Sequence, residues 1–292
     1  LYIPDPGTTM NALIAGEIDF WETPSPDLVP GMEGNPDITI KVIDPLGTQG
    51  WLRPNHLNPP FDNAKARQAL LHMVKQEDYL QAIIGDQKFW RACAAYFMCD
   101  TPLDTDIGAG PLMNQDLDEA RRLLKEGGYN GETLILMDPT DIPVLHGASL
   151  VTASMLRKIG AKVEVQAMDW STLTSRRAET KSIADGGWNI FHTYSTGADV
   201  ASPIANIGVS GGCVEEAWFG WPCDKTLEDL RDQFSRESDP AKQVEIGIAL
   251  QKRAYEVVPY VNYGQWFQPT AYRSSLKGVL ISPVPFFWNI SK

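Results

Sequence analysis

The chain has 292 residues, of which 43% are hydrophobic and 10% aromatic, and its formal net charge at pH 7 is −12. This length suits one large or two modest domains with a packed core. The acidic balance argues against non-specific binding to nucleic acids, because that binding requires clusters of Lys and Arg that displace counterions. No apolar run approaches the roughly 18 residues that a membrane-spanning helix requires.

The first third of the chain combines short strands with helices. The spacing of apolar residues predicts a helix at 8–15, strands at 18–21 and 38–44, and a helix at 64–84 with a break near 75–77. Pro59 and Pro60 stop the extended segment before this last helix, and Asp62 or Asn63 can cap its first amides. Arg67 on this helix is expected to form an ion pair at the surface.

The most regular pattern lies in the middle of the chain. Strands at 132–137, 162–168 and 188–195 alternate with helices at 143–159 and 170–180. This β-α-β-α-β order requires a parallel sheet built through right-handed crossovers. A helix at 116–126 precedes this unit, and helices at 225–237 and 240–257 and strands at 260–267 and 278–282 follow it.

The segment after the third of these strands holds the first candidate for ligand recognition. Ligands of open parallel sheets bind beyond the carboxyl ends of the strands, so residues 196–203 are expected to face a cleft. Asp199 in this segment carries a carboxylate that can hold an ammonium group. Asp is also common in turns and helix caps, which is the alternative role.

Aromatic and cationic residues elsewhere are candidates for the same site. Trp218 and Trp221 lie in a loop between two cysteines, where they either form a pocket wall or fill the core of the lobe. Tyr194 and Trp266 lie on strands expected to approach the cleft or the hinge, with core packing as the alternative. Arg53 can pair with a ligand carboxylate or with one of the 37 acidic residues of the chain.

Four cysteines bear on the redox compartment. Their pairing by sequence favours two small disulfide loops, Cys93–Cys99 and Cys213–Cys223, in an oxidising compartment. Zinc binding is disfavoured, because no Cys-x-x-Cys pair occurs and only His192 lies near a cysteine in the sequence. Four reduced, buried thiols are the alternative for a cytosolic protein.

Motifs for catalysis are few. Gly208-Val209-Ser210-Gly211-Gly212 matches the nucleophile elbow of hydrolases, which requires a histidine after the serine. The last histidine of the chain is His192, which precedes Ser210. The glycine motifs of nucleotide-binding folds and a His-Glu-x-x-His motif are also missing from the sequence. We therefore expect no enzymatic activity, no cofactor and no metal site.

The stretch Pro59-Pro60-Phe61-Asp62-Asn63 and the following Arg67-Gln68-Ala69-Leu70 resemble the signature of the family 5 extracellular solute-binding proteins. This family contains the dipeptide- and oligopeptide-binding proteins of ABC importers. Further segments are similar to the family and occur in its order, at 12–19, 118–129, 156–163 and 259–279. The resemblance therefore extends over nearly the whole chain.

The resemblance implies an α/β fold. The expected structure is a lobe of the periplasmic-binding-protein type, with a mainly parallel sheet flanked by helices, plus remnants of a second lobe. Residues 1–58 would close the first lobe, residues 59–268 would form the complete C-terminal ligand-binding lobe, and residues 269–292 would return to the first lobe. Family members are longer, so the chain is interpreted as the C-terminal portion of a larger protein.

The resemblance also implies a function, that of the extracytoplasmic substrate-binding component of an ABC transporter, which is either periplasmic or extracellular and membrane-associated. The full-length protein would be a monomer that binds a peptide-like or other small solute between two lobes and delivers it to an ABC permease in the inner membrane. In peptide-binding members, the aspartate of an Ala-Asp-x-x-x-Pro segment holds the α-ammonium of the ligand, and Ala198, Asp199 and Pro203 keep this spacing. The alternatives are a ligand-sensing domain of a regulator and a peptide hydrolase.

Overall fold

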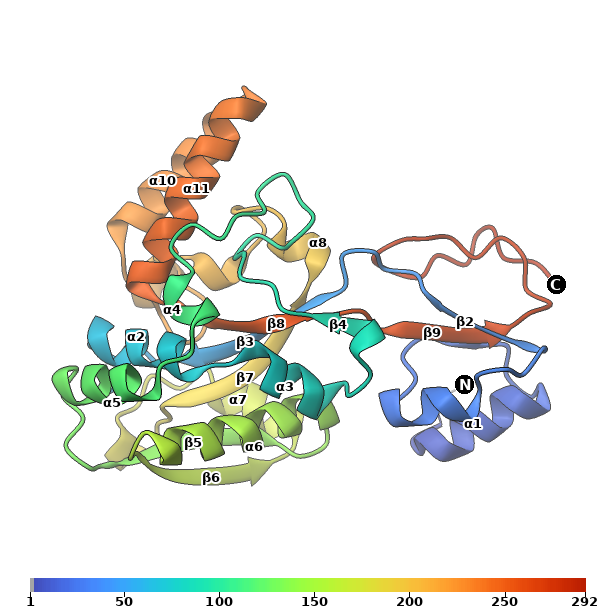
Figure 1. The fold of residues 1–292 in the computed structure, drawn as a ribbon, viewed down its shortest axis with the longest axis horizontal. Coiled ribbons are helices and arrows are strands. Elements are labelled where there is room, and N and C mark those ends of the chain that lie inside the picture. The colour runs from blue at the N-terminus through green and yellow to red at the C-terminus, as the bar shows by residue number, and fades with distance from the viewer. Residues whose placement is uncertain (1–2) are drawn as a thin grey trace.

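Two β-sheets organise the chain, and two stretches of extended backbone connect them (Figure 1). The computed structural model describes residues 3–292. The first connection leads from β2 (Ile38–Val42) into β3 (Thr48–Pro54), and the second leads from β8 (Val261–Trp266) into β9 (Pro269–Arg273). The chain therefore crosses twice between a smaller and a larger body. We call residues 43–47 and 267–268 the crossing segments.

The smaller body is a three-stranded antiparallel sheet in the order β1 (Phe20–Trp21), β9, β2. Helix α1 (Pro6–Ala15) and the 3-10 helix η1 (Pro26–Gly31) pack on one face of this sheet (Figure 1). The space between them is filled by four buried apolar side chains, Leu13, Met32, Ile38 and Ala271.

The sheet of the larger body has six strands and is mixed. Its order is β4-β8-β3-β7-β5-β6, with β4 at Trp90–Arg91, β5 at Thr133–Pro139, β6 at Lys162–Met168 and β7 at Ile190–Thr196. The unit of β5, β6 and β7 is parallel, as the sequence predicts. The prediction of a mainly parallel sheet is nevertheless wrong, because β3, β4 and β8 pair antiparallel. The chain enters this body through β3 and leaves it through the neighbouring β8, and two such strands run in opposite directions.

Helices cover both faces of the larger sheet. Helices α3 (Gln76–Ile83) and α6 (Pro143–Lys158) contribute to the main core, and α7 (Trp170–Arg176) covers a smaller core on the opposite face. Helices α10 (Lys225–Arg236) and α11 (Pro240–Val257) form a hairpin that projects from the body (Figure 1). The remaining helices are α2 (Ala64–Met73), α4 (Gly110–Met113), α5 (Leu117–Glu126), α8 (Gly197–Val200) and α9 (Cys213–Glu216), with the 3-10 helices η2 (Gln87–Phe89), η3 (Ile183–Asp185) and η4 (Ile207–Val209).

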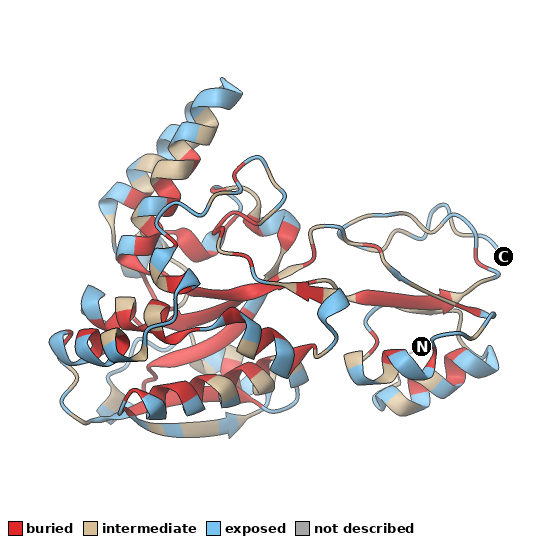
Figure 2. Ribbon diagram, in the orientation of Figure 1, coloured by how far each residue is buried: buried red, intermediate tan, exposed pale blue. Residues whose placement is uncertain are grey.

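Burial follows this arrangement. Figure 2 shows that the strands along the middle of the larger body are buried, whereas the tips of α10 and α11 are exposed. β3 lies between β7 and β8, so residues 48–54 are part of the larger sheet. The division of the chain between two lobes of a longer protein stays a prediction. Among the helices of residues 3–292, none has both the length and the apolar composition that crossing a membrane requires.

The predicted elements agree with the structure except near the C-terminus. The strand at 162–168 and the helix at 240–257 coincide with β6 and α11, and α2 and α3 are separated near the predicted break. No strand forms at 278–282, and β9 forms instead at 269–273. Gly278 explains this difference, since it has a φ of +77° and a Cβ there would lie 2.1 Å from Asn289 O. The backbone therefore turns where the sequence predicts a strand.

Arg67 of the family signature is buried, and the predicted surface ion pair is wrong. Its guanidinium donates to Phe61 O at 2.7 Å, Asp62 O at 3.1 Å and Val257 O at 2.8 Å. The turn before α2 directs its carbonyl oxygens toward the helix, so backbone acceptors replace a carboxylate. Asn63 caps α2 as predicted, because its Oδ1 accepts a hydrogen bond from Lys65 N at 2.9 Å.

Candidate functional site

Asp199 has an exposed carboxylate whose position is fixed by Thr196. β7 ends at Thr196, and α8 follows directly. The Thr196 hydroxyl accepts a hydrogen bond from Asp199 N at 3.3 Å and donates one to Asp199 Oδ2 at 2.8 Å. The other carboxylate oxygen, Oδ1, makes no hydrogen bond within the described residues. Thr196 thus caps the short helix that contains Asp199, and Asp199 keeps one oxygen available to a ligand.

Helix α8 lies against the first crossing segment, which in turn lies against the end of β8 and the start of the second. Gly197 N donates to Gly47 O at 2.6 Å, and Thr48 is in register with both Thr196 and Trp266. The backbones approach closely, because a Cβ on Gly197 would lie 2.5 Å from the Leu46 Cβ, and a Cβ on Gly47 would lie 2.3 Å from Trp266 O. Asp199 is therefore located where the two bodies join.

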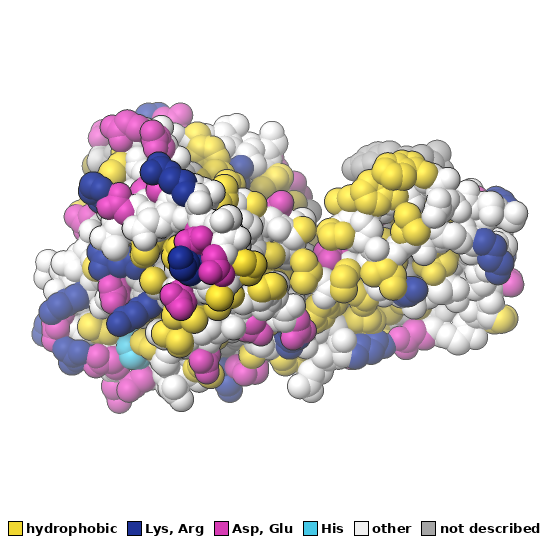
Figure 3. Space-filling model, turned by 90° about the horizontal axis from the view of Figure 1, so that it is seen from above, with side chains coloured by type: hydrophobic (Ala, Val, Ile, Leu, Met, Phe, Trp, Pro, Cys, Tyr) yellow, Lys and Arg dark blue, Asp and Glu magenta, His cyan; other side chains and the backbone are white. Residues whose placement is uncertain are grey.

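Tyr194 and Trp266 lie beside each other near the carboxyl ends of β7 and β8. Their rings pack edge to face with centroids 5.8 Å apart. Tyr194 is 44% exposed, whereas Trp266 is 3% exposed and stacks on Tyr263. Partial burial raises the pKa of Tyr194, so its hydroxyl is protonated at neutral pH. Tyr194 presents an aromatic surface near the junction, and Trp266 supports it from inside. Figure 3 shows hydrophobic side chains on both sides of the waist between the bodies.

A histidine–aspartate pair lies at the carboxyl end of β5 and is not among the residues singled out from the sequence. His146 Nδ1 is 2.8 Å from Asp138 Oδ2 and 3.0 Å from Oδ1. The Asp138 side chain, near the end of β5, is 3% exposed, and that of His146, in the first turn of α6, is 39% exposed. β5 and β7 are parallel, so their carboxyl ends point the same way, and the register of Met137 with Phe191 places Asp138 about four residues before the level of Thr196. The sequence did contain a signal for this pair, because Asp138 directly follows a predicted strand and His146 lies in the predicted helix that comes next.

The tryptophan loop, residues 217–222, lies at the opposite end of β7. Trp218 packs on Phe191, near the start of the strand, with ring centroids 5.8 Å apart. Thr196 at the carboxyl end of β7 follows Phe191 by five residues, so at about 3.3 Å per residue it lies roughly 16 Å away. The structure thus does not bring the tryptophan loop and Asp199 to one groove. The register between β3 and β7 causes this separation. Arg53, which holds the loop, pairs with Phe191 near the start of β7, whereas Thr48 pairs with Thr196 at its end.

Arg53 is fully buried and holds the tryptophan loop in place. It donates to four backbone carbonyl oxygens: Phe219 O at 2.6 Å, Trp218 O at 3.1 Å, Gly208 O at 2.5 Å and Pro259 O at 3.0 Å. Burial lowers the pKa of Arg53 to about 9. No carboxylate pairs with Arg53 within the described residues, so the expected ion pair is wrong. Its buried position also leaves it no access to a ligand carboxylate.

Trp218 and Trp221 pack in the core of the larger body. Trp221 is 5% exposed, and its ring lies 5.8 Å from that of Trp188. Trp218 packs edge to face on Trp51 at 6.0 Å, and the Arg177 guanidinium lies 5.0 Å from its ring. Of the two roles expected from the sequence, core packing is the one that the structure supports.

Both predicted disulfides, Cys93–Cys99 and Cys213–Cys223, are present, and no described cysteine is free. Residues 3–292 contain no cluster of His, Cys, Asp and Glu that could hold a metal ion. Ser210 of the elbow-like motif donates to Glu228 Oε1 at 3.1 Å, and Gly211 N donates to the same oxygen at 2.6 Å. The motif is therefore a turn tied to α10, and its serine pairs with a carboxylate instead of a histidine.

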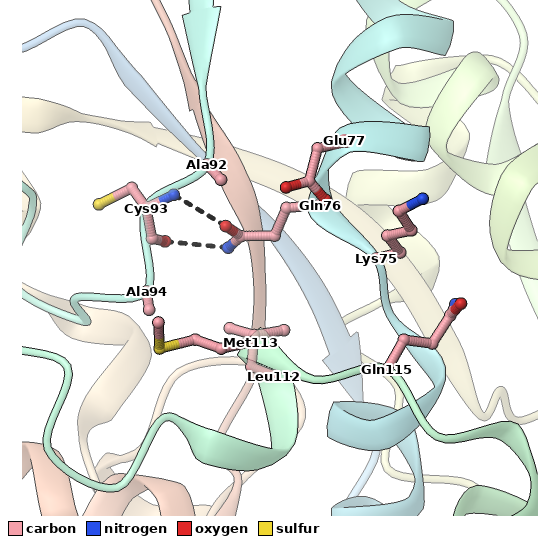
Figure 4. Close-up of a pocket in the computed structure, with 9 residues that line it drawn as sticks. All are labelled: Lys75, Gln76, Glu77, Ala92, Cys93, Ala94, Leu112, Met113 and Gln115. Atoms are coloured by element: carbon pink, nitrogen blue, oxygen red, sulfur yellow. Dashed lines mark hydrogen bonds between the residues drawn. The ribbon is translucent and has the colours of Figure 1, made fainter.

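A pocket of about 310 Å³ lies between the start of α3, the Cys93 loop and α4 (Figure 4). Gln76 crosses its wall, where Gln76 Nε2 donates to Cys93 O at 2.9 Å and Cys93 N donates to Gln76 Oε1 at 2.8 Å. The Gln76 amide also donates to Asn262 O at 2.9 Å, so its polar atoms are satisfied by the protein. None of the residues predicted to bind a ligand lines this pocket.

Two bodies joined by two crossing segments, with an exposed carboxylate at the junction, form the arrangement that is typical of solute-binding proteins. Residues 1–213 match the family "Bacterial extracellular solute-binding proteins, family 5 Middle", and the chain belongs to this family. The chain is 35% identical over 291 residues to the "Probable peptide ABC transporter periplasmic-binding protein y4tO" of Sinorhizobium fredii, covering 99% of the chain and 55% of the relative. It is 24% identical to the oligopeptide-binding protein AppA of Bacillus subtilis, covering 99% of the chain and 54% of AppA.

Solved structures show the same fold. The binding protein DppA of Helicobacter pylori, in complex with the peptide STSA, matches with a TM-score of 0.81 and 22% identity over 99% of this chain and 55% of that chain. A dipeptide-binding protein of Pseudoalteromonas in complex with Met-Leu matches with a TM-score of 0.78 and 19% identity. The match covers 99% of this chain and 57% of that protein. The chain thus spans about half the length of the relatives that it matches.

Proposed function

We propose that this chain supplies the solute-binding lobe of a periplasmic binding protein that serves a peptide importer. The observation that carries the proposal is the exposed carboxylate of Asp199, held by Thr196 at the junction of the two bodies. The peptide-binding names of similar proteins support it. The ligand would be a dipeptide, an oligopeptide or a related amine-bearing solute.

Each residue at the edge has a role in this proposal. Asp199 Oδ1 accepts a hydrogen bond from the α-ammonium of the ligand, and a bond to a charged group of this kind contributes about 1.5–3 kcal/mol. Tyr194 provides an aromatic wall for an apolar side chain. His146 directs Nδ1 at Asp138, which leaves Nε2 for a polar group further along the ligand. Trp266 supports Tyr194 from inside. Arg53, Trp218 and Trp221 lie at the opposite end of β7 and stabilise the body without touching the ligand.

Binding would be coupled to rotation of the two bodies. The crossing segments at 43–47 and 267–268 are the connections about which such a rotation occurs. A ligand that contacts both bodies shifts the population toward the closed form, since only that form makes both sets of contacts. An ABC permease in the inner membrane would recognise the closed form. No bond of the solute is made or broken.

The lobe boundaries and the oligomeric state belong to the same proposal. Residues 1–58 and 269–292 would be parts of the first lobe of a longer protein, apart from β3, which joins the larger sheet. Residues 59–268 would form the C-terminal ligand-binding lobe. Such a protein would act as a monomer, because one lobe pair encloses one solute.

The test is calorimetry of the full-length protein with a library of dipeptides and oligopeptides. Asp199→Asn removes the charge and is expected to lose binding of ligands with a free α-ammonium. Asp5→Asn is the matched control, because Asp5 is also exposed at the start of a helix and accepts from a threonine hydroxyl, Thr8 Oγ1, at 2.7 Å. Equal affinities for the wild type and Asp199→Asn would contradict the proposal.

A further inference from the structure

One ion pair joins the two bodies outside the crossing segments. Lys88 Nζ of the larger body contacts Glu33 Oε1 of the smaller body and lies 3.0 Å from Asp86 Oδ2. Lys88 belongs to η2, directly before β4, and Glu33 follows η1 by two residues. The other ion pairs found among residues 3–292 each connect residues of a single body. Hydrogen bonds to Glu33 and then to Asp86 raise the pKa of Lys88.

This pair and Asp199 lie on opposite sides of the crossing segments. In the larger sheet, the order β4-β8-β3-β7 places the two strands that lead into the crossing segments, β8 and β3, between β4 and β7. Lys88 precedes β4, whereas Asp199 follows β7. Figure 1 shows α8, with Asp199, above the line of β8 and β9, and α1 of the smaller body below it.

A groove between the bodies accompanies the ion pair. It has a volume of about 380 Å³ and is lined on the smaller body by Met32, Glu33 and strand β2, and on the larger body by Lys88 and Phe89. The Lys88 ammonium also lies 4.8 Å from the Phe89 ring centroid. The shape of this groove depends on the angle between the bodies, because its walls belong to different bodies.

We infer that Lys88 and Glu33 form a latch that favours the open orientation of the Asp199 edge and thereby lowers solute affinity from outside the binding site. A rotation about the crossing segments that brings the smaller body toward Asp199 moves it away from Lys88. Closure must therefore separate Lys88 from Glu33. The effect on affinity rests on the proposed function, whereas the effect on orientation does not.

The expected effect is modest, because the two side chains are 44% and 45% exposed. Exposed ion pairs change equilibria by roughly two- to fivefold and are screened by salt. Removing the pair should therefore shift the populations of orientations without abolishing either one, and high salt should have the same effect on the wild type.

The experiment measures the distance between the bodies by pulsed electron paramagnetic resonance. The chain has no free cysteine among its described residues, so cysteines introduced at Asn11 on α1 and Leu150 on α6 accept spin labels. Both helices lie below the line of β8 and β9 in Figure 1, on the side opposite α8, so a rotation of the smaller body toward α8 lengthens this distance. The variants are Glu33→Gln, Lys88→Met and their combination. Lys65→Met is the control, because the Lys65–Glu126 pair is also exposed but lies within the larger body.

We expect longer distances in both single variants, no further change in the double variant and no change in Lys65→Met. Unchanged or shorter distances in Glu33→Gln would overturn the inference. In the full-length protein, Glu33→Gln should also tighten binding of the probe dipeptide Ala-Ala by about two- to fivefold. If the distances lengthen but the wild type does not bind peptides, the result supports the latch and contradicts the proposed function.

Discussion

Arg53 and Gly220 approach so closely that a Cβ on residue 220 would lie 2.8 Å from Arg53 Nε. Gly220 has a φ of +98°, and its carbonyl oxygen accepts a hydrogen bond from His56 N at 2.8 Å. The tryptophan loop can therefore wrap around the buried guanidinium only because this residue has no side chain.

Gly220→Ala should consequently destabilise the larger body. The backbone conformation alone costs about 1–3 kcal/mol for a residue with a Cβ, and the clash with Arg53 adds to this. Gly128→Ala is the control, because Gly128 has a φ of +104° and no atom within 4 Å of an added Cβ. Urea unfolding should show a larger loss for Gly220→Ala than for Gly128→Ala. Equal losses would mean that contact with Arg53 does not restrict residue 220.

Burial of His192 makes stability depend on pH. His192 is fully buried, its Nε2 lies 2.9 Å from Thr152 Oγ1, and burial lowers its pKa to about 3. Between the folded pKa near 3 and the unfolded pKa near 6.5, the unfolded chain binds a proton that the folded chain does not. Stability is therefore complete above pH 6.5 and falls as the pH decreases toward 3.

The test compares the wild type with His192→Gln, which does not titrate. Between pH 7 and pH 5, the free energy of unfolding of the wild type should fall by about 2 kcal/mol more than that of the variant. Urea unfolding at both pH values measures the difference. Parallel losses in the two proteins would show that His192 is not the group responsible.

The Cys93–Cys99 disulfide closes a loop whose carbonyl oxygens organise the centre of the larger body. Cys93 O accepts from Gln76 Nε2 at 2.9 Å and from Asn262 Nδ2 at 2.7 Å. Replacing both cysteines with alanine should lower the free energy of unfolding by about 2–3 kcal/mol, because the unfolded chain gains entropy. A stability equal to that of the oxidised wild type would refute this expectation, and a reducing agent should destabilise the wild type by a similar amount.

Local features of the fold follow from the sequence because they depend on residues that are close along the chain. Alternating apolar residues at 162–168 predict β6, and Asn63 lies where a cap is needed before α2. The mixed order of the sheet has a different origin. β3 pairs with β8 across more than 200 residues, as in the register Gln49 with Gln265, and no local pattern specifies that partnership.

The candidate site shows the same division. The position of Asp199 is predictable, since it follows directly after a strand of the parallel unit, whereas its role as a ligand contact stays a prediction. The role of Arg53 is not, because its partners are backbone carbonyl oxygens that side-chain identities do not reveal. Nor is the separation of the tryptophan loop from Asp199, because it depends on the register between β3 and β7.

His146 is the residue at this edge whose role is most open to test. Its Nδ1 faces the buried carboxylate of Asp138, and its exposed side lies at the carboxyl end of β5. If Nε2 contacts the ligand, His146→Ala in the full-length protein should weaken peptide binding by roughly tenfold, the equivalent of about one hydrogen bond.

The variant Asp138→Asn tests whether Asp138 orients the His146 ring, whereas His146→Ala tests whether the ring itself contacts the ligand. Asn keeps the shape of Asp but has only one side-chain oxygen to accept from the ring, so the variant should loosen the orientation of His146 and weaken binding less than His146→Ala. Titration calorimetry of both variants and the wild type provides the affinities needed. Wild-type affinity in His146→Ala would remove this pair from the site and leave Asp199 and Tyr194 as its polar and aromatic parts. A loss in His146→Ala together with a smaller loss in Asp138→Asn is expected if the carboxylate acts by orienting the histidine.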